Sequence, residues 1–257
     1  MDTITRSMVE RLHGCPTMAV VVAAGAGSRA INWMLEVPGA SRTILEALLP
    51  YASTSLIEFL GSQPEQSASG QTAMDIAAAA YKRAARLRQS DTPIVGVGCA
   101  AALTTDRPRR GEHRCHVAAW TERSVSTYSL EFVKGLRDRA EEETIVSRLV
   151  LRALAEASDV DFDLPMELAD GETVETESIV YGDPIKAFLA GHVGTLTVHR
   201  NGKMVADEQY VGAVLAGSFN PLHPGHEELA NAASTILDSD VAYELSVTNV
   251  DKPPLEE

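Results

Sequence analysis

The sequence predicts an α/β fold, because short apolar strand patterns alternate with helical patterns along most of its 257 residues. The clearest strand is the run TMAVVVAAGAGS at 17–28, where glycines end a stretch rich in valine. The clearest helix is the alanine-rich segment at 71–89, which has basic residues in its last turns. A strand–helix–strand order at 211–250 predicts a βαβ unit near the end of the sequence.

The segments between the first strand and the alanine-rich helix are less regular. SRAINWMLEV predicts a short helix that ends before Pro38 and Gly39. Residues 41–61 have a helical pattern that Pro50 interrupts. The part before Tyr51 is therefore predicted to be either a strand or a helix, and the part after Tyr51 is predicted to be a helix.

The remaining elements of the first block follow in order. TPIVGVGCA at 92–100 predicts a second buried strand, and 114–122 with 124–132 predict a pair of strands. Residues 138–158 predict a long amphipathic helix with acids at its start. Together these elements predict an N-terminal α/β domain over 1–157 with a covered sheet.

The composition changes after this helix. Residues 158–178 are acidic and poor in aliphatic side chains, so 158–190 is predicted to be a linker. The alternative is that Phe162, Leu164 and Met166 dock onto a neighbouring element.

The last block, 191–257, combines a hairpin with the βαβ pattern. Alternating residues around Asn201-Gly202 predict a hairpin over 194–208. VGAVLAGSF at 211–219 predicts a buried strand, HEELANAASTIL a helix, and 241–250 a second strand.

Charge and cysteine content limit the functional classes. The formal net charge is −14, which argues against a broad basic face for nucleic acid. Three cysteines without paired spacing, no apolar signal-peptide core and no apolar run of membrane-spanning length predict a cytoplasmic protein without a membrane anchor.

One group of residues has side chains of the types that bind metal ions. His113, Cys115 and His116 with Cys99 suggest zinc by residue type, but no Cys-x-x-Cys pair exists. On a strand we expect Cys115 to face away from His113. The sequence therefore predicts no metal site of its own.

The stretch GSFNPLHPGH at 217–226 carries the strongest chemical pattern. A predicted strand brings Gly217 and Ser218 to the edge of a sheet, and His223 and His226 stand where the next helix begins. A helix N-terminus attracts phosphate, and the two imidazoles can donate to oxygens that gain charge as pyrophosphate leaves. The alternative is a pair of histidines that only cap the helix.

This stretch resembles the nucleotidyltransferase superfamily with the H-x-G-H signature, which includes cytidylyltransferases and nicotinamide-nucleotide adenylyltransferases. The resemblance implies a Rossmann-like fold and transfer of a nucleotidyl group from ATP or CTP, with Mg²⁺, to a phosphate-bearing acceptor. It implies His223 and His226 as catalytic residues. It covers only residues 211–257, the first βαβ unit of that fold, so we expect the unit to be incomplete for catalysis. The implied nucleotide-binding residues are Gly217, Ser218, Phe219, Asn220 and Lys252, the last of which is alternatively a solvated lysine.

The first block carries a second resemblance. Val37-Pro38-Gly39-Ala40-Ser41, Tyr51 and the segment IVGVGCAAALTTDRPRRGEHRCHVAAW resemble the C-terminal domain of competence/damage-inducible protein CinA, the nicotinamide-nucleotide amidase family. The resemblance covers most of residues 5–157 and implies a CinA C-terminal-like α/β domain that forms homo-oligomers.

The catalytic residues of the amidase family do not carry over. Ala24 stands at the position of the nucleophilic serine, and Leu56 at the position of the lysine beyond Tyr51. Ser28 is nearby, without a basic partner in the sequence around it. We therefore expect a degenerate amidase site at Ala24, Tyr51 and Leu56. The turn AAGAGS and the basic loop at 107–114 either bind a phosphate group or are only a structural turn and a solvated loop.

Three functional classes remain open on this basis: a nucleotidyltransferase, a non-catalytic nucleotide-binding or assembly module, and a surviving amidase.

Overall fold

The computed structural model describes residues 1–106, 111–181, 184–189, 192–199, 202–219 and 221–246. The chain divides into two compact units, residues 1–207 and residues 208–257, and each is described by itself.

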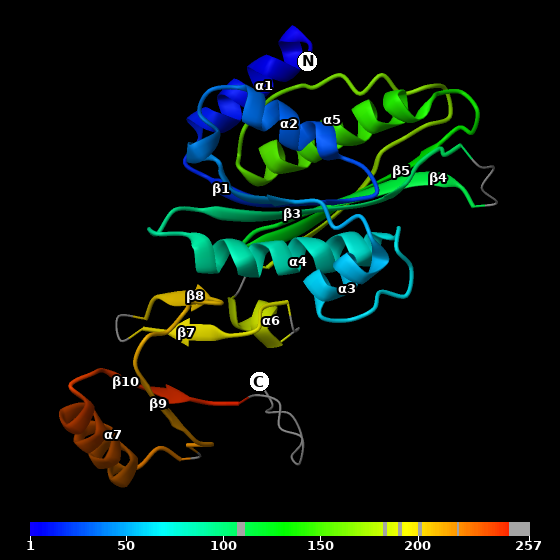
Figure 1. Cartoon of the computed structure of the whole chain (residues 1–257). Helices are drawn as coiled ribbons and strands as arrows, with labels where there is room; N and C mark the ends of the chain where they lie inside the picture. The colour runs from blue at the N-terminus through cyan, green and yellow to red at the C-terminus, as the bar shows by residue number, and fades with distance from the viewer. Residues whose placement is uncertain (107–110, 182–183, 190–191, 200–201, 220, 247–257) are drawn as a thin grey trace. The chain divides into compact units, whose positions relative to one another are not determined.

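A six-stranded mixed sheet forms the centre of the first unit (Figure 1). Its strands lie in the order β2-β1-β3-β4-β5-β6. β1 pairs in parallel with both β2 and β3, and the pairs from β3 to β6 are antiparallel. The strands are β1 (Met18–Ala24), β2 (Ile44–Leu48), β3 (Ile94–Ala102), β4 (His113–Trp120), β5 (Ser124–Phe132) and β6 (Glu175–Val180).

Helices cover both faces of this sheet (Figure 1). One face carries α1 (Thr3–Gly14), α2 (Ser28–Glu36) and α5 (Arg139–Ala157), and a short 3-10 helix, η1 (Ala40–Arg42), precedes β2. The other face carries α3 (Ser53–Leu60) and α4 (Gly70–Leu87). Because side chains alternate along a strand, β1 contributes to two apolar clusters. Ala19, Val21 and Ala23 pack with α1, α2 and α5, whereas Val20, Val22 and Ala24 pack with α3 and α4.

The strand and helix predictions for the N-terminal block are confirmed in most places. The helices at 71–89 and 138–158 and the antiparallel strand pair are present. The ambiguous segment at 41–61 divides at Pro50 into a strand and a helix, as one of its two interpretations required. α1 was not among the predicted elements; Asp2 caps its start, and its side chain accepts from the Thr5 backbone nitrogen.

Two glycines let α4 lie directly on the central strand β3. A Cβ added at Gly96 would lie 2.2 Å from both the Ala77 carbonyl oxygen and the Tyr81 backbone nitrogen. A Cβ at Gly98 would lie 2.5 Å from the Ala73 carbonyl oxygen. Real Cβ atoms do not approach backbone atoms so closely. α4 can therefore pack against β3 at this distance only because residues 96 and 98 are glycines.

The predicted linker at 158–190 is largely part of the fold. β6 lies within it and pairs with β5, from Ser124↔Val180 to Ser129↔Glu175. Leu164 is buried, and Phe162 and Met166 pack on the same cluster as α5, as the docking alternative required. The acidic composition misled the linker prediction, because one of its acids, Glu172, is a buried ion-pair partner of Arg137.

The hairpin predicted at 194–208 is confirmed. β7 (Leu196–Val198) pairs antiparallel with β8 (Met204–Ala206), and α6 (Pro184–Leu189) precedes them. All three belong to the first unit, so the boundary predicted at 191 moves to 207/208.

The second unit contains the predicted strand–helix–strand order. β9 (Ala213–Ala216) pairs in parallel with β10 (Val241–Glu244), and α7 (Pro224–Leu237) connects them. Both strands are shorter than the sequence predicts. Several apolar side chains of this unit are exposed, including Val214, Leu229 and Ile236. In the part of the chain that the structure describes, no helix combines the length and the apolar character needed to cross a membrane.

Candidate ligand-binding site

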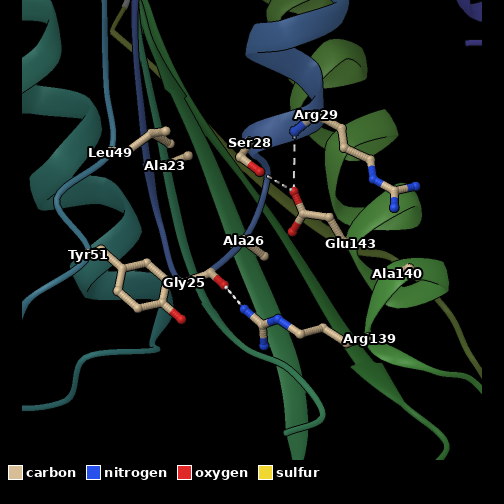
Figure 2. A pocket seen from close by; sticks show the side chains of 10 residues that line it. All are labelled: Ala23, Gly25, Ala26, Ser28, Arg29, Leu49, Tyr51, Arg139, Ala140 and Glu143. Atoms are coloured by element: carbon tan, nitrogen blue, oxygen red, sulfur yellow. Dashed lines mark hydrogen bonds between the residues drawn. The ribbon is translucent and has the colours of Figure 1, made fainter.

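A pocket of about 440 Å³ lies at the carboxyl ends of β1 and β2, between the start of α2 and the start of α5 (Figure 2). In open α/β sheets, ligands bind where successive connections leave a strand toward opposite sides. β1 is such a strand, because α2 leads from it to β2 on one side and α4 leads back to β3 on its other side. The lining residues are Ala23, Gly25, Ala26, Ser28, Arg29, Leu49, Tyr51, Arg139, Ala140 and Glu143.

The glycines of the turn after β1 have structural reasons to be there. Gly25 has a φ of 86°, and a Cβ at this residue would lie 2.1 Å from the Ala101 carbonyl oxygen. Gly27 has a φ of 95°, also in the left-handed region that favours glycine. The glycine pattern of AAGAGS is therefore explained by backbone geometry and by the neighbouring strand β3, without reference to a phosphate.

The N–H groups at the start of α2 are already bonded to a carboxylate. Oε1 of Glu143 accepts from the backbone nitrogens of Gly27 and Arg29 at 3.1 and 3.2 Å and from Oγ of Ser28 at 2.9 Å. Oε2 accepts from the same Gly27 nitrogen at 3.1 Å. A negative group at a helix N-terminus is stabilised by the helix dipole. Glu143, from α5, thus occupies the position at which the AAGAGS turn would hold a phosphate.

Three consecutive acids begin α5, and each has a different partner. Glu141 forms a capping box with Asp138. Glu142 is fully buried, where it lies 2.9 Å from Nδ1 of His113 and accepts from the backbone nitrogen of Thr104. Glu143 extends to α2. In the sequence all three are acids at the start of one predicted helix, and nothing in the local pattern distinguishes the residue that reaches the pocket.

The guanidinium groups of two arginines of the pocket donate only to neutral acceptors. Arg139 donates from Nη1 and Nη2 to the carbonyl oxygens of Thr104 and Gly25, both at 3.0 Å. Arg29 donates to Oγ1 of Thr144 at 2.6 Å. Among the described residues, neither guanidinium has a carboxylate within ion-pair distance. Both retain N–H donors for a ligand.

The opposite rim of the pocket is apolar and aromatic. Tyr51 is 81% exposed and Leu49 is 55% exposed, directly after β2. Figure 2 shows the Tyr51 ring near Gly25 and on the other side of the pocket from Arg29. An exposed aromatic ring in the same pocket as two guanidinium groups is an arrangement that suits a planar group joined to an anion.

The three predicted residues of the degenerate amidase site do not come together. Tyr51 lines the pocket, but Ala24 and Leu56 are buried in the apolar cluster under α3 and α4. The Ser28 hydroxyl donates a hydrogen bond at 2.9 Å to the Glu143 carboxylate of α5, which lies 115 residues away in the sequence. That carboxylate also accepts from two backbone N–H groups, and no lysine or histidine lines the pocket. The arrangement is a helix cap and lacks the activated nucleophile of an amide hydrolase.

The H-x-G-H residues of the second unit lie at the start of α7. The rings of His223 and His226 stack with centroids 3.8 Å apart, and Nδ1 of His226 accepts from the His223 backbone nitrogen at 3.4 Å. Phe219 packs edge-on against His226 and against Tyr243 of β10. Gly217 follows β9, and a Cβ there would lie 2.9 Å from the Phe219 ring. Ser218 lies between these two residues in the sequence. Asn220 and Lys252, which were also predicted to bind the nucleotide, lie outside the described residues.

Of the four residues with zinc-ligand side chains, His113, Cys99 and Cys115 are buried and His116 is half-buried. His113 and Cys115 lie on the same face of β4, close to Glu142, because residues two apart share a face; the expectation that they face apart was wrong. His116 faces the other side and lies 2.8 Å from Oγ of Ser129. Burial raises the pKa of the Cys99 and Cys115 thiols, which keeps them protonated. The described residues contain no group of three or more His, Cys, Asp and Glu arranged to hold a metal ion.

No protein-family model matches the sequence, and the search of curated proteins found no match. Solved structures similar to this chain include competence/damage-inducible protein CihA from Agrobacterium tumefaciens, with 17% identity, a TM-score of 0.45, and 62% of this chain and 97% of that chain covered. Another is a competence or damage-inducible protein from Enterobacter asburiae, with 13% identity, a TM-score of 0.47, and 62% and 100% covered. A third is a CinA superfamily protein from Escherichia coli, with 15% identity, a TM-score of 0.44, and 60% and 86% covered.

Proposed function

We propose that the first unit binds a small anionic molecule with a planar ring, of the nucleotide class, and does not hydrolyse it. The observation that carries the proposal is the pair of arginines, Arg29 and Arg139, which line one pocket and whose guanidinium groups donate only to neutral acceptors. Guanidinium groups in a partly enclosed site favour phosphate or carboxylate ligands, because their N–H donors match these oxygens.

The aromatic rim supports the same class of ligand. Tyr51 offers an exposed face on which a base can stack, which typically contributes about 1–3 kcal/mol per base. A nucleotide carries a base and a phosphate separated by a ribose, so it can contact Tyr51 and the two arginines within one pocket. The resemblance to nicotinamide-nucleotide amidases is consistent with this class, and the apolar residues Ala24 and Leu56 argue against the amidase reaction.

Alanine substitutions at Arg29 and Tyr51 test this proposal. We expect calorimetric titration with AMP and nicotinamide mononucleotide to give at least a tenfold loss of affinity for Arg29→Ala and a smaller loss for Tyr51→Ala, because each removes one type of ligand contact. Arg86→Ala removes an exposed arginine of α4 that does not line the pocket, and it should bind as the parent chain does. Equal affinity in all variants would contradict the proposal, and ammonia release from nicotinamide mononucleotide would show that the unit is still an amidase.

A second candidate function belongs to the second unit. The observation that favours it is the position of His223 and His226 at the start of α7, one loop after β9, where both imidazoles meet the helix end that attracts phosphate. We propose that this unit binds the phosphate groups of ATP or CTP and contributes to nucleotidyl transfer to a phosphate-bearing acceptor. Mg²⁺ takes oxygen ligands, which these imidazoles and aromatic rings do not provide, so we assign it no ligand in this unit.

Replacing His223 and His226 together with alanine tests this second function. The parent chain should bind ATP weakly, because only a few charge-assisted hydrogen bonds are available, each contributing about 1.5–3 kcal/mol, and it should not release pyrophosphate at a useful rate. The double variant should bind ATP more weakly than the parent chain. His199→Ala, which removes a histidine of the first unit, is the control and should bind ATP as the parent chain does. Unchanged ATP binding in the double variant would show that the H-x-G-H assignment is wrong.

A further inference from the structure

We propose that Glu143 is a specificity-determining residue, which makes the pocket select a ligand with one negative charge over a ligand with two. The chemical class is a phosphodiester or carboxylate monoanion attached to a planar ring, in preference to a phosphate monoester. This inference rests on the proposed function of the first unit and goes beyond it, because it states which anions that pocket accepts.

The charges that line the pocket give the first argument. Of its ten lining residues, only Arg29, Arg139 and Glu143 are charged, so the formal sum is +1. A ligand with a single negative charge neutralises that sum. A phosphate monoester carries about −1.5 to −2 at pH 7 and leaves an excess of negative charge. In a partly enclosed site such an excess costs binding free energy, because charges interact more strongly there than in bulk water.

The fixed position of Glu143 gives the second argument. Its carboxylate accepts hydrogen bonds of 2.9 to 3.2 Å from the backbone nitrogens of Gly27 and Arg29 and from the Ser28 hydroxyl. These bonds hold the carboxylate at the wall of the pocket. Neither Arg29 nor Arg139 forms an ion pair with it, so its charge is not cancelled by the two cations that would contact the ligand. A monoester must bind beside this negative charge or displace it from the start of α2.

The neighbouring acids cannot take this role. Glu142 is buried and lies beside His113 and Thr104, away from the pocket lining. Glu141 is exposed and accepts from the Asp138 backbone nitrogen at the start of α5. Glu141 therefore provides a matched control, since its replacement changes the net charge of the chain equally without changing the pocket.

The test compares 3′,5′-cyclic AMP, a monoanion, with AMP, which is close to a dianion at pH 7.5, in calorimetric titrations of the parent chain and two variants. We expect the parent chain to bind cyclic AMP at least fivefold more tightly than AMP. Glu143→Gln keeps an oxygen that accepts from Gly27 and Ser28 but removes the charge. The ratio of the affinity for AMP to the affinity for cyclic AMP should therefore be at least fivefold higher in this variant than in the parent chain. Glu141→Gln should keep the parent's ratio, and thermal melts of all three proteins establish that the fold is retained.

The outcomes separate this inference from the function on which it rests. If both ligands bind in an Arg29-dependent manner but Glu143→Gln leaves their ratio unchanged, the inference is wrong and the proposed function stands. If neither ligand binds to the parent chain or to any variant, both are wrong. A parent chain that binds AMP more tightly than cyclic AMP also contradicts the inference.

Discussion

Replacing Gly96 with alanine is expected to lower the free energy of unfolding of the first unit by about 3 kcal/mol, the upper end of the usual range for overpacking. The added methyl carbon would lie 2.2 Å from two backbone atoms of α4, at Ala77 and Tyr81, and backbone atoms cannot rotate away. The helix must shift as a whole, which loosens the apolar cluster that it forms with β1 and β3.

Urea unfolding followed by tryptophan fluorescence measures this effect. Both tryptophans of the chain, Trp33 and Trp120, lie in the first unit, so the signal reports on that unit alone. Gly14→Ala is the matched control, because a Cβ at Gly14 would have no atom within 4 Å apart from its chain neighbours and the backbone of its own helix. A midpoint for Gly96→Ala equal to that of Gly14→Ala would mean that α4 is not seated on β3 as described.

Replacing Glu172 with alanine is expected to cost about 3–5 kcal/mol, the usual penalty for breaking a buried ion pair by removing one partner. The Glu172 side chain has no exposed surface, and its Oε1 accepts from Nη1 of Arg137 at 2.6 Å. It also accepts from the backbone nitrogens of Val133 and Ala169 at 2.9 Å. The variant leaves a guanidinium and two N–H groups without these acceptors, and it releases the segment that leads to β6.

The comparison variant is Glu112→Ala, which removes an exposed partner of Lys134 and should cost less than about 1 kcal/mol. The pH dependence provides a second readout. Burial acts to raise the pKa of Glu172, but hydrogen bonds from Arg137, Ala169 and Val133 outweigh it and hold the pKa below its ordinary value. The stabilisation is therefore present above the pKa of the unfolded chain, about 4.3, and is lost as the pH falls through the folded pKa. In Glu172→Ala the free energy of unfolding should fall less steeply below pH 5 than in the parent chain. Equal slopes of the free energy of unfolding against pH in the two proteins would contradict this prediction.

The sequence predicts the elements whose cause is local. The valine run of β1, the alanine-rich α4 and the strand–helix–strand order of the second unit each depend on the period of their own apolar residues, and each is present. The turn before α3 follows from Pro50, which is also a local cause. A single sequence is sufficient for features of this kind.

The sequence does not predict features that depend on distant partners. β6 has no apolar alternation, because every residue from Glu175 to Val180 is exposed, and it is a strand only because β5 offers it a free edge. Glu143 has the same local surroundings as Glu141 and Glu142, yet it meets the start of α2 across 116 residues, from position 27 to 143. The sequence therefore predicts only part of the pocket, the AAGAGS turn and Tyr51, and does not predict Arg29, Arg139 or Glu143 as its lining.

The strand order of the sheet also determines when the fold can form. β4 and β5 are neighbours in sequence and can pair as soon as both exist, whereas Met18 of β1 pairs with Ile94 of β3, a separation of 76 residues. Loop closure over such distances is entropically costly and slows folding. On a growing chain, β1 remains without its second neighbour until β3 has been synthesised, and the edge of β5 stays open until Val180 arrives. The valine-rich first strand of the nascent protein is thus exposed to association with other chains until β3 has been synthesised.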